Sequence, residues 1–233
     1  MVIELKNIFA GYGKKNILKD ISYTFKEGLF YGIFGPNGCG KSTLSKIISK
    51  ELLPQTGIVN VPWKNSYNRA KLLAVADQSV PVTLPLKVRE IVQLGTYPWE
   101  STLRNNTKKL DKIVEDNLQL FDLQDLANSN YSTLSGGQKQ LVMLCKVLAQ
   151  NTPIILLDEP ASSLDVGARH KLCQILKQVA QKEQKCIIMI SHDPFIVPAY
   201  LDEAILMEDG KIKYFGHPQD VLEEQHLKEV FNY

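Results

Sequence analysis

A glycine-rich turn between an apolar run and an amphipathic segment restricts the fold of this chain more than any other feature. Residues 29–34 are apolar and aromatic, and Gly-Pro-Asn-Gly-Cys-Gly-Lys-Ser follows them directly at positions 35–42. Leu44, Ile47 and Ile48 then recur at helical spacing. A buried strand, a G-x-x-x-x-G-K-S loop and a helix in this order are typical of a phosphate-binding loop in an α/β fold.

This loop has the chemistry to surround the phosphates of a nucleotide. Its glycines let backbone N–H groups turn inward, and the helix N-terminus adds about half a positive charge. Lys41 can reach the terminal phosphates, and the Ser42 hydroxyl is placed to bind Mg²⁺. Cys39 is interpreted as a small filler and not a redox switch, because nothing in the sequence indicates a lowered pKa. The predicted nucleotide contacts here are Gly35, Pro36, Asn37, Gly38, Cys39, Gly40, Lys41, Ser42 and Thr43.

A second apolar run ends in two carboxylates. Residues 154–157 read Ile-Ile-Leu-Leu and precede Asp158 and Glu159. Acids at the carboxyl end of a buried parallel strand lie where α/β folds bind their ligands. Asp158 is predicted to hold Mg²⁺ or its water, and Glu159 to act as base on an attacking water. Simple turns also carry this pattern, so the interpretation depends on the neighbouring phosphate loop.

A third motif predicts another anion-binding site. Leu-Ser-Gly-Gly-Gln at 134–138 precedes a helical pattern at 137–149. Its glycines and the helix N-terminus can bind phosphate. Two phosphate sites on one chain of this size indicate a nucleotide held between two copies. The predicted contacts of this second site are Ser135, Gly136, Gly137 and Gln138.

The remaining patterns indicate an α/β core with an inserted helical segment. Two strands are expected at 1–9 and 17–25 with hairpin chemistry between them, and two more short strands at 204–207 and 212–215. A helix whose apolar stripe starts at Ala168 lies between the strands at 154–157 and 186–190, which predicts a parallel crossover. Helical patterns at 88–94, 108–121 and 137–149 place the insertion at about 79–150 of a single domain, 1–233.

The composition excludes several classes of protein. The chain has 233 residues with 27 Lys+Arg and 25 Asp+Glu, a net charge of +2 that argues against a nucleic-acid binder. No apolar run approaches the roughly 18 residues of a membrane span. The first residues lack a signal-peptide pattern, and the four cysteines form no C-x-x-C pair. An intracellular protein with free thiols is expected.

With LSGGQ between the phosphate loop and the acid-tipped strand, the sequence resembles the ABC-type ATPases. The resemblance covers nearly the whole chain and continues with Ser-Leu-Asp at 163–165, like the family's D-loop, and Ile-Ser-His-Asp at 190–193, like its switch histidine segment. It implies a P-loop NTPase core with a mixed, mostly parallel sheet, an antiparallel β subdomain and a helical signature subdomain. It also implies ATP and Mg²⁺ as ligands and a homodimer as the working form.

The resemblance implies roles for single residues. Gln78 matches the Q-loop glutamine, which binds Mg²⁺ and senses the membrane partner, and it is counted among the expected catalytic residues. Tyr12 matches the aromatic that stacks on adenine, His192 the residue that contacts the γ-phosphate, and Asp165 the D-loop acid. Leu141 and Lys146 stand where family members commonly have arginines, and altered packing or salt bridging is expected there.

Two segments resemble importers of iron–siderophores, haem and vitamin B12. Residues 84–98 are similar to "TVRELVxLGRxP", with Thr96 in place of an arginine, and residues 210–222 are similar to "DGRIVAxGxPEEVL". This implies separate membrane permease subunits, an indirect link to a substrate-binding protein, and a place on the cytoplasmic face of the membrane. Zinc, manganese or molybdate importers remain open, as do a mechanical ABC ATPase and a non-hydrolysing regulator.

The segment after Gln78 carries apolar and aromatic residues close together. They are Val80, Val82, Leu84, Tyr97 and Trp99. A groove that receives a helix of the permease would need such side chains. Packing as ordinary core beneath the helical insertion is the other interpretation.

Overall fold

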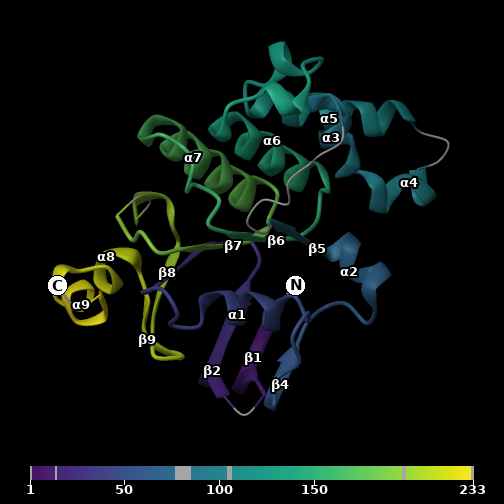
Figure 1. Cartoon of the computed structure of the whole chain (residues 1–233). Helices are drawn as coiled ribbons and strands as arrows, with labels where there is room; N and C mark the ends of the chain where they lie inside the picture. Colours follow the sequence, from purple (N-terminus) through teal and green to yellow (C-terminus); the bar gives the residue numbers. More distant parts are fainter. Residues whose placement is uncertain (1, 14, 77–84, 104–106, 196–197, 232–233) are drawn as a thin grey trace.

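The computed structural model describes residues 2–13, 15–76, 85–103, 107–195 and 198–231 (Figure 1). The strands are β1 (Val2–Tyr12), β2 (Lys15–Lys26), β3 (Phe30–Phe34), β4 (Thr56–Asn60), β5 (Leu73–Ala76), β6 (Ile154–Asp158), β7 (Cys186–Ser191), β8 (Glu203–Glu208) and β9 (Lys211–Gly216). The α-helices are α1 (Lys41–Ile48), α2 (Ser66–Leu72), α3 (Val88–Leu94), α4 (Tyr97–Leu103), α5 (Thr107–Leu120), α6 (Gly136–Ala149), α7 (Val166–Lys182), α8 (Pro218–Val221) and α9 (Glu224–Phe231). Short 3₁₀ turns lie at Gln124–Leu126, Tyr131–Thr133 and Pro198–Tyr200.

A six-stranded sheet forms the centre of the molecule. Its order is β5-β6-β7-β3-β8-β9, and every neighbouring pair is parallel except β8 and β9, which are antiparallel. Strands β2, β1 and β4 form a separate antiparallel sheet in that order. The α/β fold expected from the sequence, with a mixed, mostly parallel sheet and an antiparallel subsheet, is confirmed.

The inner strands β6, β7, β3 and β8 are buried on both faces of the sheet, because their alternate side chains enter different cores. In β6, Ile155 and Leu157 belong to a core shared with α3, α5, α6 and α7. Ile154 and Leu156 belong to a second core shared with α1, β1 and β2. Figure 1 shows the resulting layers, with α6 and α7 on one side of the sheet and α1 and the antiparallel sheet on the other.

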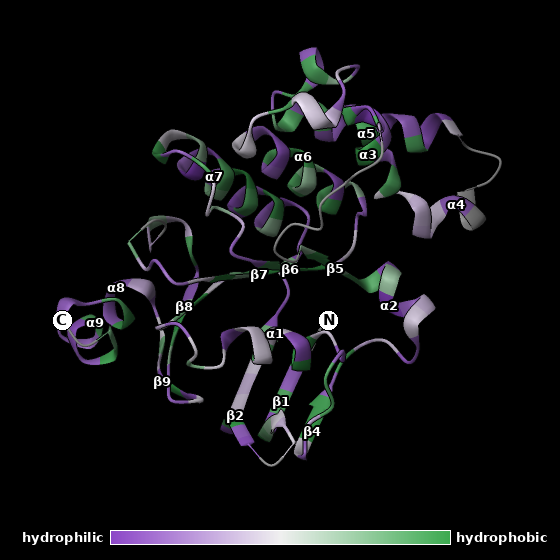
Figure 2. Ribbon diagram, viewed as in Figure 1, coloured by the Kyte–Doolittle hydropathy of each residue, from purple (hydrophilic) through white to green (hydrophobic). Residues whose placement is uncertain are grey.

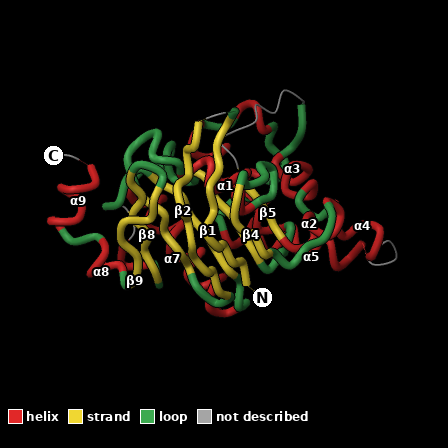
Figure 3. Tube along the Cα trace, turned by 90° about the horizontal axis from the view of Figure 1, so that it is seen from below, coloured by secondary structure: helices red, strands yellow, loops and turns green. Residues whose placement is uncertain are grey.

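The helices of the upper layer are amphipathic. Apolar and polar stretches alternate along α6 and α7 in Figure 2. In α7 the buried residues recur with helical spacing, at Leu172, Ile175, Leu176 and Val179. Figure 3 shows α8 and α9 on the side of the molecule where β9 forms the sheet edge, and α3, α4 and α5 on the opposite side, beyond β5.

Several boundaries differ from the sequence expectation. The hairpin strands are longer than predicted, since β1 and β2 reach Tyr12 and Lys15. The signature helix begins one residue early, at Gly136, because Ser135 caps it. Strand β4 and helices α2, α4, α8 and α9 were not predicted. β4 is largely exposed and α2 contains no buried residue, so neither has a strong apolar pattern.

Helices α3, α4, α5 and α6 fall within the 79–150 segment expected to be inserted, and α3 packs against α5 and α6. Among the described residues, no helix combines the length and the apolar character needed to cross a bilayer.

Candidate functional site

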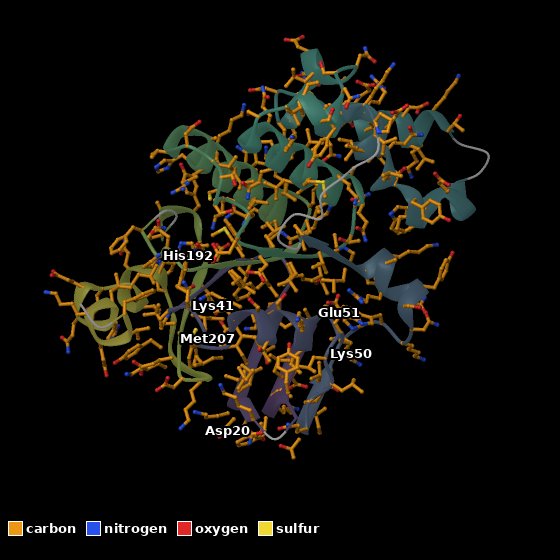
Figure 4. The ribbon with its side chains drawn as sticks, viewed as in Figure 1. Asp20, Lys41, Lys50, Glu51, His192 and Met207 are labelled. Carbon is orange, nitrogen blue, oxygen red and sulfur yellow. The ribbon has the colours of Figure 1, made fainter. Side chains whose placement is uncertain are left out.

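The strand order brings three sequence motifs to one edge of the sheet. β6, β7 and β3 are adjacent and parallel, so their carboxyl ends lie together. β6 ends in Asp158 and is followed by Glu159, β7 ends in Ser191 before His192, and β3 leads into Gly35. Figure 4 labels two of these contributions, Lys41 at the start of α1 and His192 after β7.

The phosphate-binding loop has the backbone geometry that its glycines allow. Gly40 caps α1 with a φ of 112°, a conformation that side chains rarely adopt. At Gly35 a Cβ atom would lie 2.3 Å from the carbonyl oxygen of Met207, which Figure 4 also labels. Lys41 is 7% exposed, and its ammonium donates to the carbonyl oxygens of Gly35 at 2.7 Å and Pro36 at 3.0 Å. The side chain of the lysine therefore folds back over the glycine-rich loop that precedes it in the sequence.

A cavity of about 230 Å³ joins this loop to the acidic strand end. It combines backbone N–H groups, an ammonium, hydroxyls and carboxylates, a donor and acceptor set suited to a phosphorylated ligand. Its lining residues are Ile17, Asn37, Gly38, Gly40, Lys41, Ser42, Thr43, Asp158 and Glu159.

Glu159 is held in an unusual backbone conformation at the wall of this cavity. Its φ is +52°, and its N–H donates to the Ile190 carbonyl at 2.9 Å. One carboxylate oxygen lies 2.9 Å from Nδ1 of His192, and the other is 3.5 Å from the Ser191 hydroxyl. The Glu159 side chain is 10% exposed and the His192 ring 55%. The carboxylate is thus mostly enclosed, whereas the imidazole is open to a ligand.

Tyr12 lies apart from the cavity lining, at the end of β1. It is 49% exposed, and its hydroxyl accepts from the Lys46 ammonium at 3.3 Å. The same ammonium lies 5.6 Å from the centre of the Tyr12 ring. Since Lys46 is on α1, the ring is positioned beside the helix that begins at the phosphate loop.

The side chains of the LSGGQ motif form a helix cap. Ser135 and Gln138 form a capping box at the start of α6, in which each side chain accepts from the other residue's backbone N–H. Asp165 caps α7 by accepting from the Ala168 N–H at 2.9 Å. Neither cap lines the phosphate cavity, so the structure of one chain does not bring the two predicted anion sites together.

Comparisons with known proteins identify the family in which these motifs occur together. A family model described as ABC transporter matches residues 18–162. The hemin import ATP-binding protein HmuV of Shewanella denitrificans is 33% identical over 100% of this chain and 94% of that protein. The petrobactin import ATP-binding protein FpuD of Bacillus anthracis is 30% identical over 98% of this chain and 86% of that protein.

Solved structures give the same result. An inward-facing metal-chelate type ABC transporter matches with a TM-score of 0.83 and 26% identity, over 99% of this chain and 89% of that one. The dimeric structure of a bacterial ABC transporter cassette matches with a TM-score of 0.80 and 29% identity, over 93% and 98%. This chain belongs to the ABC transporter family and is an ATPase. The family resemblance found in the sequence is thereby confirmed.

The ABC ATPase offers oxygen ligands of the kind that Mg²⁺ prefers. The Ser42 hydroxyl and the Asp158 carboxylate line the same cavity as Lys41. The described residues contain no group of three or more His, Cys, Asp or Glu side chains that could hold a metal by themselves. Gln78, the other predicted ligand, lies outside the described residues, as do Val80, Val82 and Leu84.

Two site features of the ATPase were not found from the sequence. Gln140 of α6 reaches the backbone after β6, and the Ser191 hydroxyl approaches Glu159. A glutamine inside a helical pattern gives no signal for such a contact. Ser191 could have been found, because it precedes His192 at a strand end.

The structure also shows the surroundings of three positions that the sequence analysis discussed, Cys39, Leu141 and Thr96. Cys39 is buried, and burial raises the pKa of its thiol, in keeping with a filler. Leu141 packs at the margin of the helical core, and the Thr96 hydroxyl donates to the Gln93 carbonyl at 2.8 Å. At both positions a local contact occupies the place where the family resemblance led us to expect an arginine.

Proposed function

We propose that this chain is the ATP-hydrolysing subunit of an importer for metal chelates of the iron–siderophore or haem class. The main support for ATP hydrolysis is one cavity at the ends of β3 and β6. Lys41 and Ser42 line this cavity together with Asp158 and Glu159. The proposed class of cargo rests on the relatives, since proteins named for hemin and petrobactin import match nearly the full chain.

The proposed mechanism begins with ATP in this cavity. Lys41 exchanges the carbonyl oxygens of its loop for the terminal phosphates, with the loop N–H groups and the helix N-terminus binding the remaining charge. Ser42, Asp158 and Gln78 would hold Mg²⁺, which neutralises charge on the phosphates when bound. Tyr12 would stack on the adenine.

Glu159 is proposed to act as general base. Its enclosed carboxylate accepts a proton from the attacking water, and His192 keeps that carboxylate oriented while its exposed ring faces the γ-phosphate. The catalytic set is therefore Lys41, Gln78, Glu159 and His192.

Closure of a homodimer would complete the site. The Ser135, Gly136, Gly137 and Gln138 segment of a second copy, together with Asp165, would face the nucleotide bound by the first. The matching dimeric cassette structure supports this arrangement. ATP binding then favours the closed dimer, and hydrolysis reopens it, which drives the attached permease subunits. Such an ATPase would lie on the cytoplasmic face of the membrane, bound through the permease and linked only indirectly to a substrate-binding protein.

The experiment that tests this function uses the chain assembled with its permease in lipid vesicles. Phosphate release and uptake of hemin, a ferric siderophore, cobalamin, zinc, manganese and molybdate are measured in parallel. ATP-dependent uptake of an organic iron complex supports the proposal. Uptake of zinc, manganese or molybdate alone would favour the other importer class, and absence of phosphate release would favour a non-hydrolysing regulator.

A further inference from the structure

Gln140 connects the helical layer to the backbone of the acidic strand end. It lies in α6, two residues after the LSGGQ motif, and its side-chain amide extends toward the loop after β6. Nε2 donates to the Glu159 carbonyl at 3.1 Å, and Oε1 accepts from the Ser163 N–H at 2.9 Å. Nε2 also lies 3.5 Å from the Ser162 hydroxyl. One side chain thus contacts both ends of the segment that joins Glu159 to residues 163–165.

The backbone of Glu159 needs such support. A φ of +52° is uncommon for residues other than glycine and persists where the surrounding structure fixes it. Its N–H is fixed by the Ile190 carbonyl of β7 at 2.9 Å. Its carbonyl accepts from Gln140 at 3.1 Å and from the Ser162 N–H at 3.3 Å. The direction of the Glu159 side chain therefore depends on β7 on one side and on α6 on the other.

We propose that Gln140 is a positioning residue for ATP hydrolysis, through which the placement of α6 sets the orientation of the Glu159 carboxylate. This rests on the proposed role of Glu159 as general base. When α6 lies as it does here, the amide of Gln140 holds the Glu159 carbonyl and the Ser163 N–H together, and the carboxylate points to His192. A displacement of α6 relative to the sheet releases both contacts at once. The signature helix thereby controls the base as well as its own phosphate site.

Substitutions can test the donor and the acceptor function of the Gln140 amide separately. Gln140→Met keeps the length and volume of the side chain and removes both hydrogen bonds. Gln140→Lys keeps a donor for the Glu159 carbonyl, and Gln140→Glu keeps only an acceptor for the Ser163 N–H.

Gln150, at the other end of α6, is the matched control. Its Nε2 donates to the carbonyl oxygens of Ala70 at 2.7 Å and Leu73 at 3.1 Å, far along the helix from the signature motif. Gln150→Met removes hydrogen bonds of the same kind with no link to Glu159.

Steady-state hydrolysis by the full chain, the KM for ATP and the Tm are measured for each variant. For Gln140→Met we expect kcat to fall roughly tenfold, the effect of one to two hydrogen bonds, with KM changed less than about twofold. Gln140→Glu should be as slow, and Gln140→Lys should recover part of the rate. Gln150→Met should lower the Tm and leave kcat within about twofold, since its bonds serve stability.

A double variant separates positioning from structural damage. In the Glu159→Gln background the group to be positioned has lost its function, so Gln140→Met should change the residual single-turnover rate by less than about twofold. An unchanged kcat in Gln140→Met, or an undiminished effect in the Glu159→Gln background, would overturn the inference while the proposed function stands. A wild-type chain without hydrolysis, or a fully active Glu159→Gln variant, would overturn the proposed function itself.

Discussion

Nδ1 of His192 lies 2.9 Å from a carboxylate oxygen of Glu159, although the two residues follow different strands. β6 and β7 are neighbours in register, with Asp158 beside Ile190, so the residues that follow each strand meet at the sheet edge. The contact couples an enclosed carboxylate to an exposed imidazole.

Replacement of Glu159 by glutamine tests the base. Glu159→Gln keeps the shape of the side chain and its capacity for hydrogen bonding but cannot accept a proton, so hydrolysis should fall by ~10²–10⁴ while ATP binding persists. Light scattering with ATP should detect a stable dimer of this variant. Asp111→Asn on the exposed side of α5 is the control and should behave as the wild-type chain. A monomeric Glu159→Gln variant at saturating ATP, alone and with its permease, would contradict the shared site.

Removal of the His192 ring tests the contact described above. His192→Ala should lower kcat by about 10–100-fold, because it removes both the partner of Glu159 and a proposed phosphate contact. The Tm should change little, since the ring is 55% exposed. His170→Ala on α7, where the ring contacts Tyr200, is the control and should hydrolyse ATP normally. Equal losses in the two variants would argue against a specific role for His192.

Calorimetric titration tests the stacking role of Tyr12. Tyr12→Ala should weaken ATP binding by about 1–3 kcal/mol, the range found for stacking of a base on an aromatic side chain. Tyr12→Phe keeps the ring and loses the contact of the hydroxyl with Lys46, so its affinity should stay near that of the wild-type chain. The stacking role is wrong if Tyr12→Ala binds ATP as tightly as Tyr12→Phe.

An introduced charge at Tyr97 tests where the permease binds. Tyr97 is 69% exposed at the start of α4, where a glutamate is compatible with the helix. Tyr97→Glu should leave the Tm and ATP binding unchanged and abolish copurification with the permease. Ile58→Glu, at a 56% exposed position of β4, should assemble normally. A Tyr97→Glu variant that assembles and transports at the wild-type rate would exclude this surface.

Thiol labelling tests the buried cysteines. Burial raises the pKa of Cys145, Cys173 and Cys186 to about 12 each, and it raises that of Cys39 as well. Only the thiolate reacts, so the native chain should resist a disulfide reagent at pH 8 and react fully in denaturant. The unfolded chain ionises its thiols at lower pH than the folded chain, so stability should fall as pH rises above about 9. Rapid native labelling at Cys39 would contradict its interpretation as a filler.

The motifs of the proposed site could be found in the sequence because each motif is local. A G-x-x-x-x-G-K-S loop needs only the strand before it and the helix after it, and both are visible in residues 29–48. The same holds for the strand that ends in Asp158 and for the helix that Ser135 caps, which is why the fold class and the family were predicted correctly.

The weakly patterned segments were not predicted for a physical reason. β4 is mostly exposed and α2 buries no residue, so neither needs the apolar periodicity by which strands and helices are found in a sequence. Their positions follow from pairing with β1 and packing against α4.

Only the tertiary structure decided which motifs meet. The chain order of the strands is β3, β6, β7, whereas the sheet order is β6-β7-β3, and this places His192 against Glu159 beside the phosphate loop. The Gln140 contact with the Glu159 carbonyl likewise depends on how α6 lies over the sheet. Local sequence determines which groups a strand end or helix start carries. The packing of distant apolar faces determines which of those groups come within hydrogen-bonding distance.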